Sequence, residues 1–187
     1  MRAQIFTLAN QFTLLRLALV PFFVLTVLDG RYGWALALLV AAGLSDFLDG
    51  LLARWLKQRT SLGSYLDPIA DKLLLSTSFV VLAVAGNVPW TLTILVLSRD
   101  ILIVAVALVI IIGAGFRPFP PSFLGKACTT AQIITVFVVV LEEVVPRGWL
   151  AASKEVSLWT TAALTVFSGL HYAYRTGKML PDLGSKN

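Results

Sequence analysis

Six long apolar runs constrain the fold of this chain more than any other feature. They fall at about 12–28, 33–52, 68–86, 89–114, 122–141 and 149–172, separated by short polar or Gly/Pro-containing breaks. A transmembrane helix needs about 20 apolar residues to cross roughly 30 Å of hydrocarbon. We therefore predict an all-α membrane protein with six transmembrane helices. The prediction is one domain over residues 1–187, in which residues 1–11 form a short interfacial segment.

The composition supports a membrane protein and excludes other classes. The 187 residues are 58% hydrophobic and 13% charged, whereas a soluble domain is about 45–50% apolar and about 25% charged. The single cysteine, Cys128, excludes an intramolecular disulfide. The N-terminus lacks the pattern of a removable signal peptide, so we expect the first apolar run to stay in the mature protein.

The basic residues gather on one side of the predicted spans. Arg2, Arg54, Lys57, Arg59, Arg117, Lys126, Arg175, Lys178 and Lys186 fall on one side, and Arg31, Arg147 and Lys154 fall on the other. By the positive-inside rule, both termini of this multi-pass protein are expected to be cytoplasmic, with the cell (inner) membrane as its location. The net charge of +5 then favours anionic lipid head groups or phosphorylated substrates as partners, and no nucleic acid.

Four carboxylates interrupt the apolar pattern between the second and third runs. One set stands at i, i+3, i+4, i+7 and i+8, and so shares one helix face: Asp46, Asp49, Gly50, Ala53 and Arg54. A second set shares a face if the third helix begins near its first member: Gly63, Asp67 and Asp71. Helices joined by a short loop are antiparallel neighbours. The four carboxylates are therefore expected to meet in one cytoplasm-facing polar cavity.

Such a cavity favours a hard divalent cation. Four anions packed together repel one another strongly where the dielectric constant is low. Carboxylate oxygens select Mg²⁺, Mn²⁺ or Ca²⁺ over softer metals, and two ions can be accommodated.

Structural interpretations compete at individual positions. Asp67 followed by Pro68 is also a good helix start. Asp46 or Asp49 can pair with an arginine for purely structural reasons, and Gly50 and Ala53 also suit close helix packing.

The spacing of these residues resembles a known family signature. The string Asp46-x2-Asp49-Gly50-x2-Ala53-Arg54-x8-Gly63-x3-Asp67-x3-Asp71 is similar, at every fixed position, to that of the CDP-alcohol phosphatidyltransferases. The similarity is greatest to the phosphatidylglycerophosphate synthase and CDP-diacylglycerol-dependent cardiolipin synthase branch. The resemblance implies an integral membrane homodimer that uses two divalent ions, Mg²⁺ or Mn²⁺, per active site. It also implies transfer of a phosphatidyl group from CDP-diacylglycerol to an alcohol, with release of CMP.

The same resemblance assigns roles to individual residues. It implies that the metal ligands are Asp46, Asp49, Asp67 and Asp71, and that Asp71 is the catalytic residue that deprotonates the acceptor hydroxyl. The implied CDP-donor-binding residues are Gly50, Ala53, Arg54, Gly63, Asn10 and Thr13. The last two belong to an N-x-x-T-x-x-R entry to the first helix that ends at Arg16. A capped helix with a snorkelling Arg16 explains that entry equally well.

Three cations outside the signature are candidates for binding the acceptor. Arg99 belongs to a Ser98-Arg99-Asp100 sequence inside an apolar run, where an ionisable pair is a functional candidate by default. A self-neutralising structural pair would give the same sequence. Lys126 begins a K-x-x-T-x-x-Q pattern similar to the same branch. We hypothesise that Arg99, Arg117 and Lys126 together receive an acceptor phosphate.

Several functions fit this pattern. The first is synthesis of phosphatidylglycerophosphate from CDP-diacylglycerol and sn-glycerol 3-phosphate, by direct attack of the acceptor hydroxyl with no covalent enzyme intermediate. The second has phosphatidylglycerol as acceptor, which makes a cardiolipin synthase, and inositol phosphate is a further acceptor. A divalent-cation transporter is a remote alternative from another class. We give no catalytic role to His171, Glu142 or Glu143.

Overall fold

The computed structural model describes the backbone of residues 8–56, 61–114 and 123–184, and the side chains of residues 14–45, 70–105 and 123–174. The described backbone forms six helices and no strand. The helices are α1 (Leu8–Leu28), α2 (Tyr32–Leu56), α3 (Ser61–Val84), α4 (Trp90–Ala114), α5 (Phe123–Val144) and α6 (Gly148–Gly184). Each helix contains one predicted apolar run or nearly all of it, so the all-helical prediction is confirmed.

Two of the helix ends depend on a glycine in the left-handed conformation. Gly30 follows α1 with φ of 70°, and Gly86 follows α3 with φ of 82°. In each case the next amide donates to the carbonyl five residues earlier, from Arg31 to Thr26 at 2.8 Å and from Asn87 to Leu82 at 2.9 Å. This is the Schellman arrangement, which favours glycine because a Cβ atom is strained at positive φ. The chain therefore turns sharply into α2 and α4.

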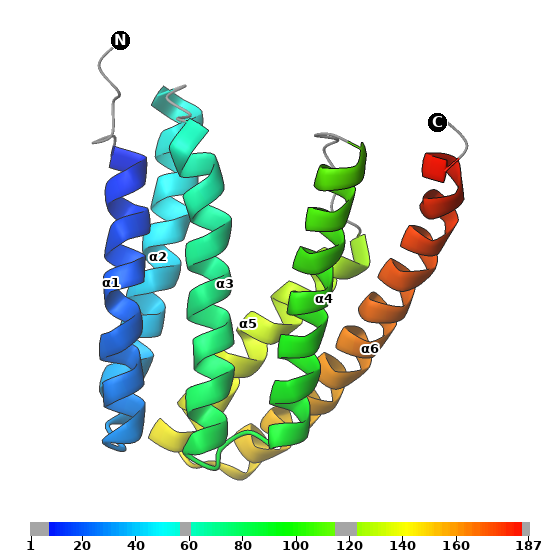
Figure 1. Ribbon diagram of the computed structural model, residues 1–187. Helices are drawn as coiled ribbons and strands as arrows, with labels where there is room; N and C mark the ends of the chain where they lie inside the picture. The colour runs from blue at the N-terminus through cyan, green and yellow to red at the C-terminus, as the bar shows by residue number, and fades with distance from the viewer. Residues whose placement is uncertain (1–7, 57–60, 115–122, 185–187) are drawn as a thin grey trace.

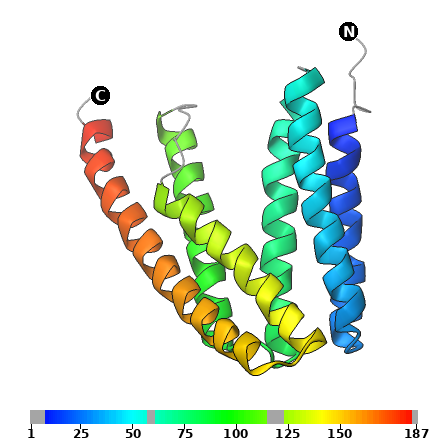
Figure 2. The ribbon, with the colours of Figure 1, turned by 180° about the vertical axis from the view of Figure 1, so that it is seen from behind.

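The six helices diverge from one end of the molecule. The turns at residues 29–31, 85–89 and 145–147 gather at one end, here called the closed end (Figures 1 and 2). The other end, where α1 begins at Leu8 and α6 ends at Gly184, is called the open end (Figure 1). Helices α1, α2 and α3 stand together on one side, and α4 and α6 lean away on the other, with α5 crossing between them (Figures 1 and 2).

The tightly packed core lies between the two groups of helices. Its fully buried members include Phe79 and Leu82 of α3, Val96 of α4, and Val139 and Val140 of α5. Such close packing gains dispersion energy from many small contacts. The core therefore holds the two helix groups together towards the closed end.

Large apolar side chains are exposed on every described helix. They include Phe22 at 59%, Trp34 at 68%, Ile94 at 60% and Trp159 at 74% exposure. Soluble monomers rarely expose extensive apolar surface, so this pattern is typical of an exterior that faces lipid. Among the described residues, α5 is the one helix long and apolar enough by itself to cross a membrane. Six spans therefore remain a prediction.

The start of α3 and the end of α6 differ from the bounds predicted from the apolar runs. Helix α3 begins at Ser61, so positions 67 and 68 lie inside it, and the interpretation of Asp67 as a helix cap is wrong. Gly63, Asp67 and Asp71 are thus successive positions on one helix face.

Helix α6 extends to Gly184, beyond the predicted end at residue 172. Its 37 residues measure about 55 Å at about 1.5 Å per residue, because the polar C-terminal sequence continues as helix past the apolar run.

Candidate active site

The backbone brings the signature onto two antiparallel helices. Positions 46–54 lie in α2 and positions 63–71 lie in α3, in the halves of these helices that are nearer the open end (Figure 1). Asp71 is the member of the signature whose side chain is described. The other predicted residues of the metal and donor sites have side chains outside the described residues: Asn10, Thr13, Asp46, Asp49, Gly50, Ala53, Arg54, Gly63 and Asp67. Arg117 also lies outside the described residues.

Asp71 forms an ion pair with Arg16 of α1. Nη1 of Arg16 donates to Oδ1 of Asp71, across 55 positions of sequence. The side chain of Arg16 is 2% exposed and that of Asp71 is 52% exposed. The interpretation of Arg16 as a snorkelling residue is therefore wrong. Its guanidinium turns inward, where a buried cation requires an anionic partner.

The ion pair lies at the polar end of a pocket with a volume of about 360 Å³. Among the described residues, α1 packs against both α2 and α3, whereas the backbones of α2 and α3 do not pack directly against each other. The pocket occupies the space between α2 and α3, and α5 closes it. The charged lining consists of Arg16, Asp71 and Lys72, and most of the remaining lining is apolar: Leu39, Ala42, Leu74, Leu75, Ile133, Val136 and Phe137.

The pocket fits a charged group that is joined to an apolar chain. Gly43 also borders it, and a Cβ atom added there would meet nothing within 4 Å. The pocket continues along α3 from Asp71 to Ser78, about two helical turns towards the closed end. Its shape and polarity match a lipid with an ionic head better than a wholly polar metabolite.

The donor chemistry of the signature fits divalent ions. Asp71 presents a half-exposed carboxylate to the pocket, and the other three predicted ligands are also carboxylates, the oxygen donors that Mg²⁺ and Mn²⁺ prefer. Within the described segments alone, no three metal-binding side chains come together. The predicted cluster therefore depends on Asp46, Asp49 and Asp67, whose side chains the structure does not describe.

A second ionic cluster, in which Arg99 and Asp100 are buried, begins at Lys72, the residue next to Asp71 in α3. Nζ of Lys72 lies 2.8 Å from Oδ1 of Asp100, and Nη1 of Arg99 lies 2.7 Å from the same oxygen. Nη2 of Arg99 donates to Oγ of Ser168 at 3.0 Å. The cluster therefore links α3, α4 and α6, whereas the pair at Asp71 links α3 to α1.

The predicted acceptor cations differ in accessibility. Lys126 is exposed near the start of α5, and Arg99 is 7% exposed, with its two Nη atoms directed at Asp100 and Ser168. The ion pair anticipated from the Arg99-Asp100 sequence is therefore present. Thr129 of the K-x-x-T-x-x-Q pattern lines the pocket, and Gln132 is fully buried.

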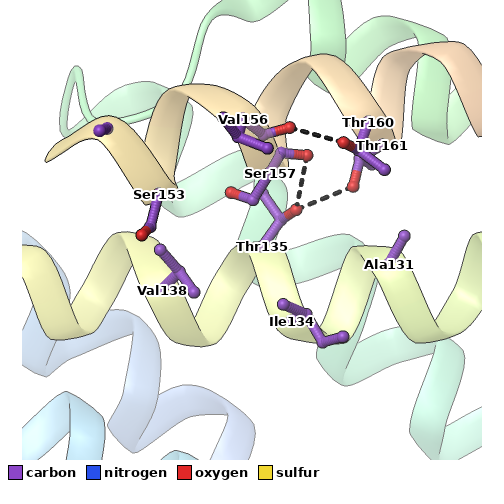
Figure 3. A pocket seen from close by; sticks show the side chains of 10 residues that line it. Ala131, Ile134, Thr135, Val138, Ser153, Val156, Ser157, Thr160 and Thr161 are labelled. Carbon is purple, nitrogen blue, oxygen red and sulfur yellow. Dashed lines mark hydrogen bonds between the residues drawn. The ribbon is translucent and has the colours of Figure 1, made fainter. Parts of the chain in front are cut away.

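A larger cavity, of about 470 Å³, lies between α5 and α6. Figure 3 shows that small and β-branched side chains line it and that its threonine hydroxyl groups form hydrogen bonds within the helix pair. Thr135 bonds to Thr161 at 2.8 Å and donates to the Ser157 carbonyl at 3.1 Å. These contacts are typical of small and hydroxyl-bearing residues that join membrane helices. No charged side chain among the described residues lines this cavity, so we do not propose it as the active site.

Charged residues also meet at the closed end. Lys154 of α6 lies 3.1 Å from Glu142 and 3.5 Å from Glu143, both near the end of α5. Asn87, after α3, donates to Glu143 at 2.5 Å and accepts from Tyr32 at 2.9 Å. Glu142 and Glu143 thus bind Lys154 at the closed end, whereas Asp71 pairs with Arg16 beside the pocket.

Sequence reasoning missed the roles of three members of these two ionic clusters. Arg16 and Lys72 were not predicted to line the site, and Asp100 was not predicted to bind Lys72. One signal was present: arginine or lysine inside an apolar run is costly and requires a partner. The identity of that partner depends on how helices pack, which spacing along one helix does not encode.

Comparison with known proteins identifies the family. Residues 6–167 match the model of the CDP-alcohol phosphatidyltransferase family. The chain belongs to this family, whose members are membrane proteins. The match includes the complete signature in α2 and α3.

Similar proteins have two kinds of name. The chain is 35% identical to a Mycobacterium tuberculosis protein named "Probable phosphatidylglycerophosphate synthase", over 98% of this chain and 86% of that protein. It is 39% identical to a "Putative cardiolipin synthase" of the same organism, over 67% of this chain and 60% of that protein's length. It is 31% identical to the human "Cardiolipin synthase (CMP-forming)", over 94% of this chain and 64% of that protein.

Proposed function

We propose that this protein is an enzyme of phospholipid synthesis that transfers the phosphatidyl group of CDP-diacylglycerol to sn-glycerol 3-phosphate. The observation that carries the proposal is the half-exposed Asp71 carboxylate at the charged end of an otherwise apolar pocket. A lipid-linked donor has the same division between an ionic head and apolar chains. The products are phosphatidylglycerophosphate and CMP.

The chemistry assigned to the site is a direct displacement. The acceptor hydroxyl attacks the β-phosphorus of the donor, Asp71 takes the hydroxyl proton, and CMP leaves with the electrons of the broken phosphoanhydride bond. Asp46, Asp49, Asp67 and Asp71 would hold two divalent ions, Mg²⁺ or Mn²⁺. When bound, these ions neutralise charge on the pyrophosphate and stabilise the departing CMP. Gly50, Ala53, Arg54, Gly63, Asn10 and Thr13 are the proposed donor-binding residues.

The choice of acceptor rests on the relatives. The relative named for phosphatidylglycerophosphate synthesis aligns with nearly all of this chain and most of its own length, which favours glycerol 3-phosphate. The second candidate is cardiolipin synthesis with phosphatidylglycerol as acceptor, because the relative named for it has the higher identity over a shorter segment. We further propose a homodimer in the cell membrane, with six spans and both termini in the cytoplasm.

We propose Arg99, Arg117 and Lys126 as the residues that bind the acceptor phosphate. Lys126 gives the simplest test because it is exposed. Arg99 would first have to release Asp100 or Ser168 before it could bind an acceptor phosphate. The expected effect of Lys126→Ala is about a tenfold rise in the KM for the acceptor, equivalent to about 1.4 kcal/mol, with little change for CDP-diacylglycerol. A larger rise in the donor KM, measured by initial rates, would contradict this role.

The proposed function is tested by CMP release. Purified protein receives CDP-diacylglycerol and Mg²⁺ or Mn²⁺, with glycerol 3-phosphate, phosphatidylglycerol, inositol phosphate or serine offered separately. We expect release with glycerol 3-phosphate. Release with phosphatidylglycerol alone would establish the second candidate. If folded protein releases CMP with none of the four acceptors, both candidates are removed. Ping-pong kinetics or a trapped phosphatidyl-enzyme would contradict direct attack.

A further inference from the structure

The ion pair between Arg16 and Asp71 joins two side chains that differ greatly in exposure. Arg16 is 2% exposed, and Asp71 is 52% exposed and borders the pocket. Removing a guanidinium from solvent is strongly unfavourable unless an anion accompanies it. The Arg16 side chain therefore has a fixed place in the helix packing, and the Asp71 carboxylate is attached to it at the wall of the pocket.

The pair holds the Asp71 carboxylate through one of its oxygens, Oδ1. Arg16 lies on α1, and α1 packs along α3, the helix that presents Asp71. A guanidinium is planar, with donors in a rigid fork, so it restricts a bound carboxylate more than a flexible ammonium does. A carboxylate has two oxygens and about four acceptor sites. One group can therefore bind Arg16 and a divalent ion at the same time.

Two roles for Arg16 follow from these contacts. In one, Arg16 competes with the metal ion and must release Asp71 before the ion binds. In the other, Arg16 stays in place and orients Asp71 for the ion and for the acceptor hydroxyl. The burial of Arg16 favours the second role, because release of Asp71 would separate a buried cation from an anion that accompanies it.

We propose that Arg16 is a positioning residue for the reaction: through its ion pair it orients the Asp71 carboxylate within the pocket. This inference rests on the proposed function, in which Asp71 is a metal ligand and takes the acceptor proton. Partners that orient metal ligands typically change metal affinity or activity by about 10–100-fold when they are removed. The effect of losing Arg16 should fall in this range.

The test uses Arg16→Lys in the full chain, purified in lipid nanodiscs. This variant keeps the positive charge and removes the rigid fork, so it separates orientation from electrostatics. Mn²⁺ binding is measured by electron paramagnetic resonance, and kcat and KM are measured with CDP-diacylglycerol and glycerol 3-phosphate. The expected result is about 10–100-fold weaker Mn²⁺ binding and a similar loss of kcat, with the donor KM changed less than threefold.

Lys154→Arg is the matched control. It is also a charge-conserving change in an ion pair between helices, but it lies at the closed end. Its Mn²⁺ affinity and kcat should equal those of the wild type. Equal losses in the two variants would mean that any disturbed ion pair lowers activity, and would overturn the inference.

The outcomes separate the inference from the function on which it rests. If the wild type binds Mn²⁺ and releases CMP while Arg16→Lys matches it within twofold, the inference alone is overturned. If the wild type neither binds Mn²⁺ nor releases CMP, the proposed function fails and the inference fails with it. Should Arg16→Lys not fold, Arg16→Gln decides: weaker Mn²⁺ binding supports orientation, and tighter binding shows competition and overturns it.

Discussion

Two sets of ion pairs between helices, one beside the pocket and one at the closed end, join oppositely charged side chains for different purposes. Around Asp71, one half-exposed carboxylate borders a pocket and a fully buried arginine holds it. At the closed end, Lys154, Glu142 and Glu143 are between 18% and 28% exposed, and none of the three lines either of the two cavities described above. An ion pair therefore indicates a reactive site when one partner is accessible and the other partner fixes its position.

The largest effect is expected from Asp71→Asn. The amide keeps the size of the side chain but removes a metal ligand and the proposed proton acceptor, so CMP release should fall by about 10²–10⁴-fold, the range typical of an acid–base group. The matched control is Glu143→Gln, the same chemical change at the closed end, which should leave turnover within twofold of the wild type. Retained turnover in Asp71→Asn, measured on protein with wild-type helicity, would contradict the assigned site.

A smaller effect is expected from filling the pocket. Gly43→Leu places an apolar side chain in the space beside Ala42, so the KM for CDP-diacylglycerol should rise by about tenfold, or about 1.4 kcal/mol of lost binding. Gly33→Leu is the control, because it is also in α2 with nothing within 4 Å of an added Cβ atom, and it does not line the pocket. Similar donor KM values for both variants would show that the pocket does not bind the lipid donor.

The smallest effect on catalysis is expected from Lys154→Met. The change leaves two neighbouring carboxylates without their lysine partner, and it should lower the free energy of unfolding by about 1 kcal/mol, as for partly exposed ion pairs. Thermal unfolding in detergent measures this loss, and CMP release should stay at the wild-type rate. A tenfold loss of turnover without unfolding would mean that the closed end takes part in the reaction.

Much of the architecture could be predicted from the sequence because it depends on local patterns. The apolar runs predicted the six helices, and regular spacing predicted that Gly63, Asp67 and Asp71 share a helix face, which the start of α3 at Ser61 supports. The glycines at 30 and 86 have the positive φ values that a sharp helix end requires. These features involve residues at most a few turns apart.

The partners of the charged residues could not be predicted in the same way. Arg16 and Asp71 are 55 positions apart, and Lys72 and Asp100 are 28 positions apart. Whether Arg16 extends towards the membrane surface or turns inward depends on which helix packs beside α1. Likewise, the position of α1 against both α2 and α3, which leaves space for a pocket, is a property of the whole helix arrangement.

The central claim is that the charged end of the pocket is a metal-dependent phosphatidyltransferase site. The most direct test is CMP release by purified wild-type protein from CDP-diacylglycerol and glycerol 3-phosphate, before chelation of divalent ions, after chelation, and after their return. The account predicts that chelation stops release and that Mg²⁺ or Mn²⁺ restores it. Release that continues unchanged in chelator would contradict the role assigned to Asp71 and its neighbouring carboxylates.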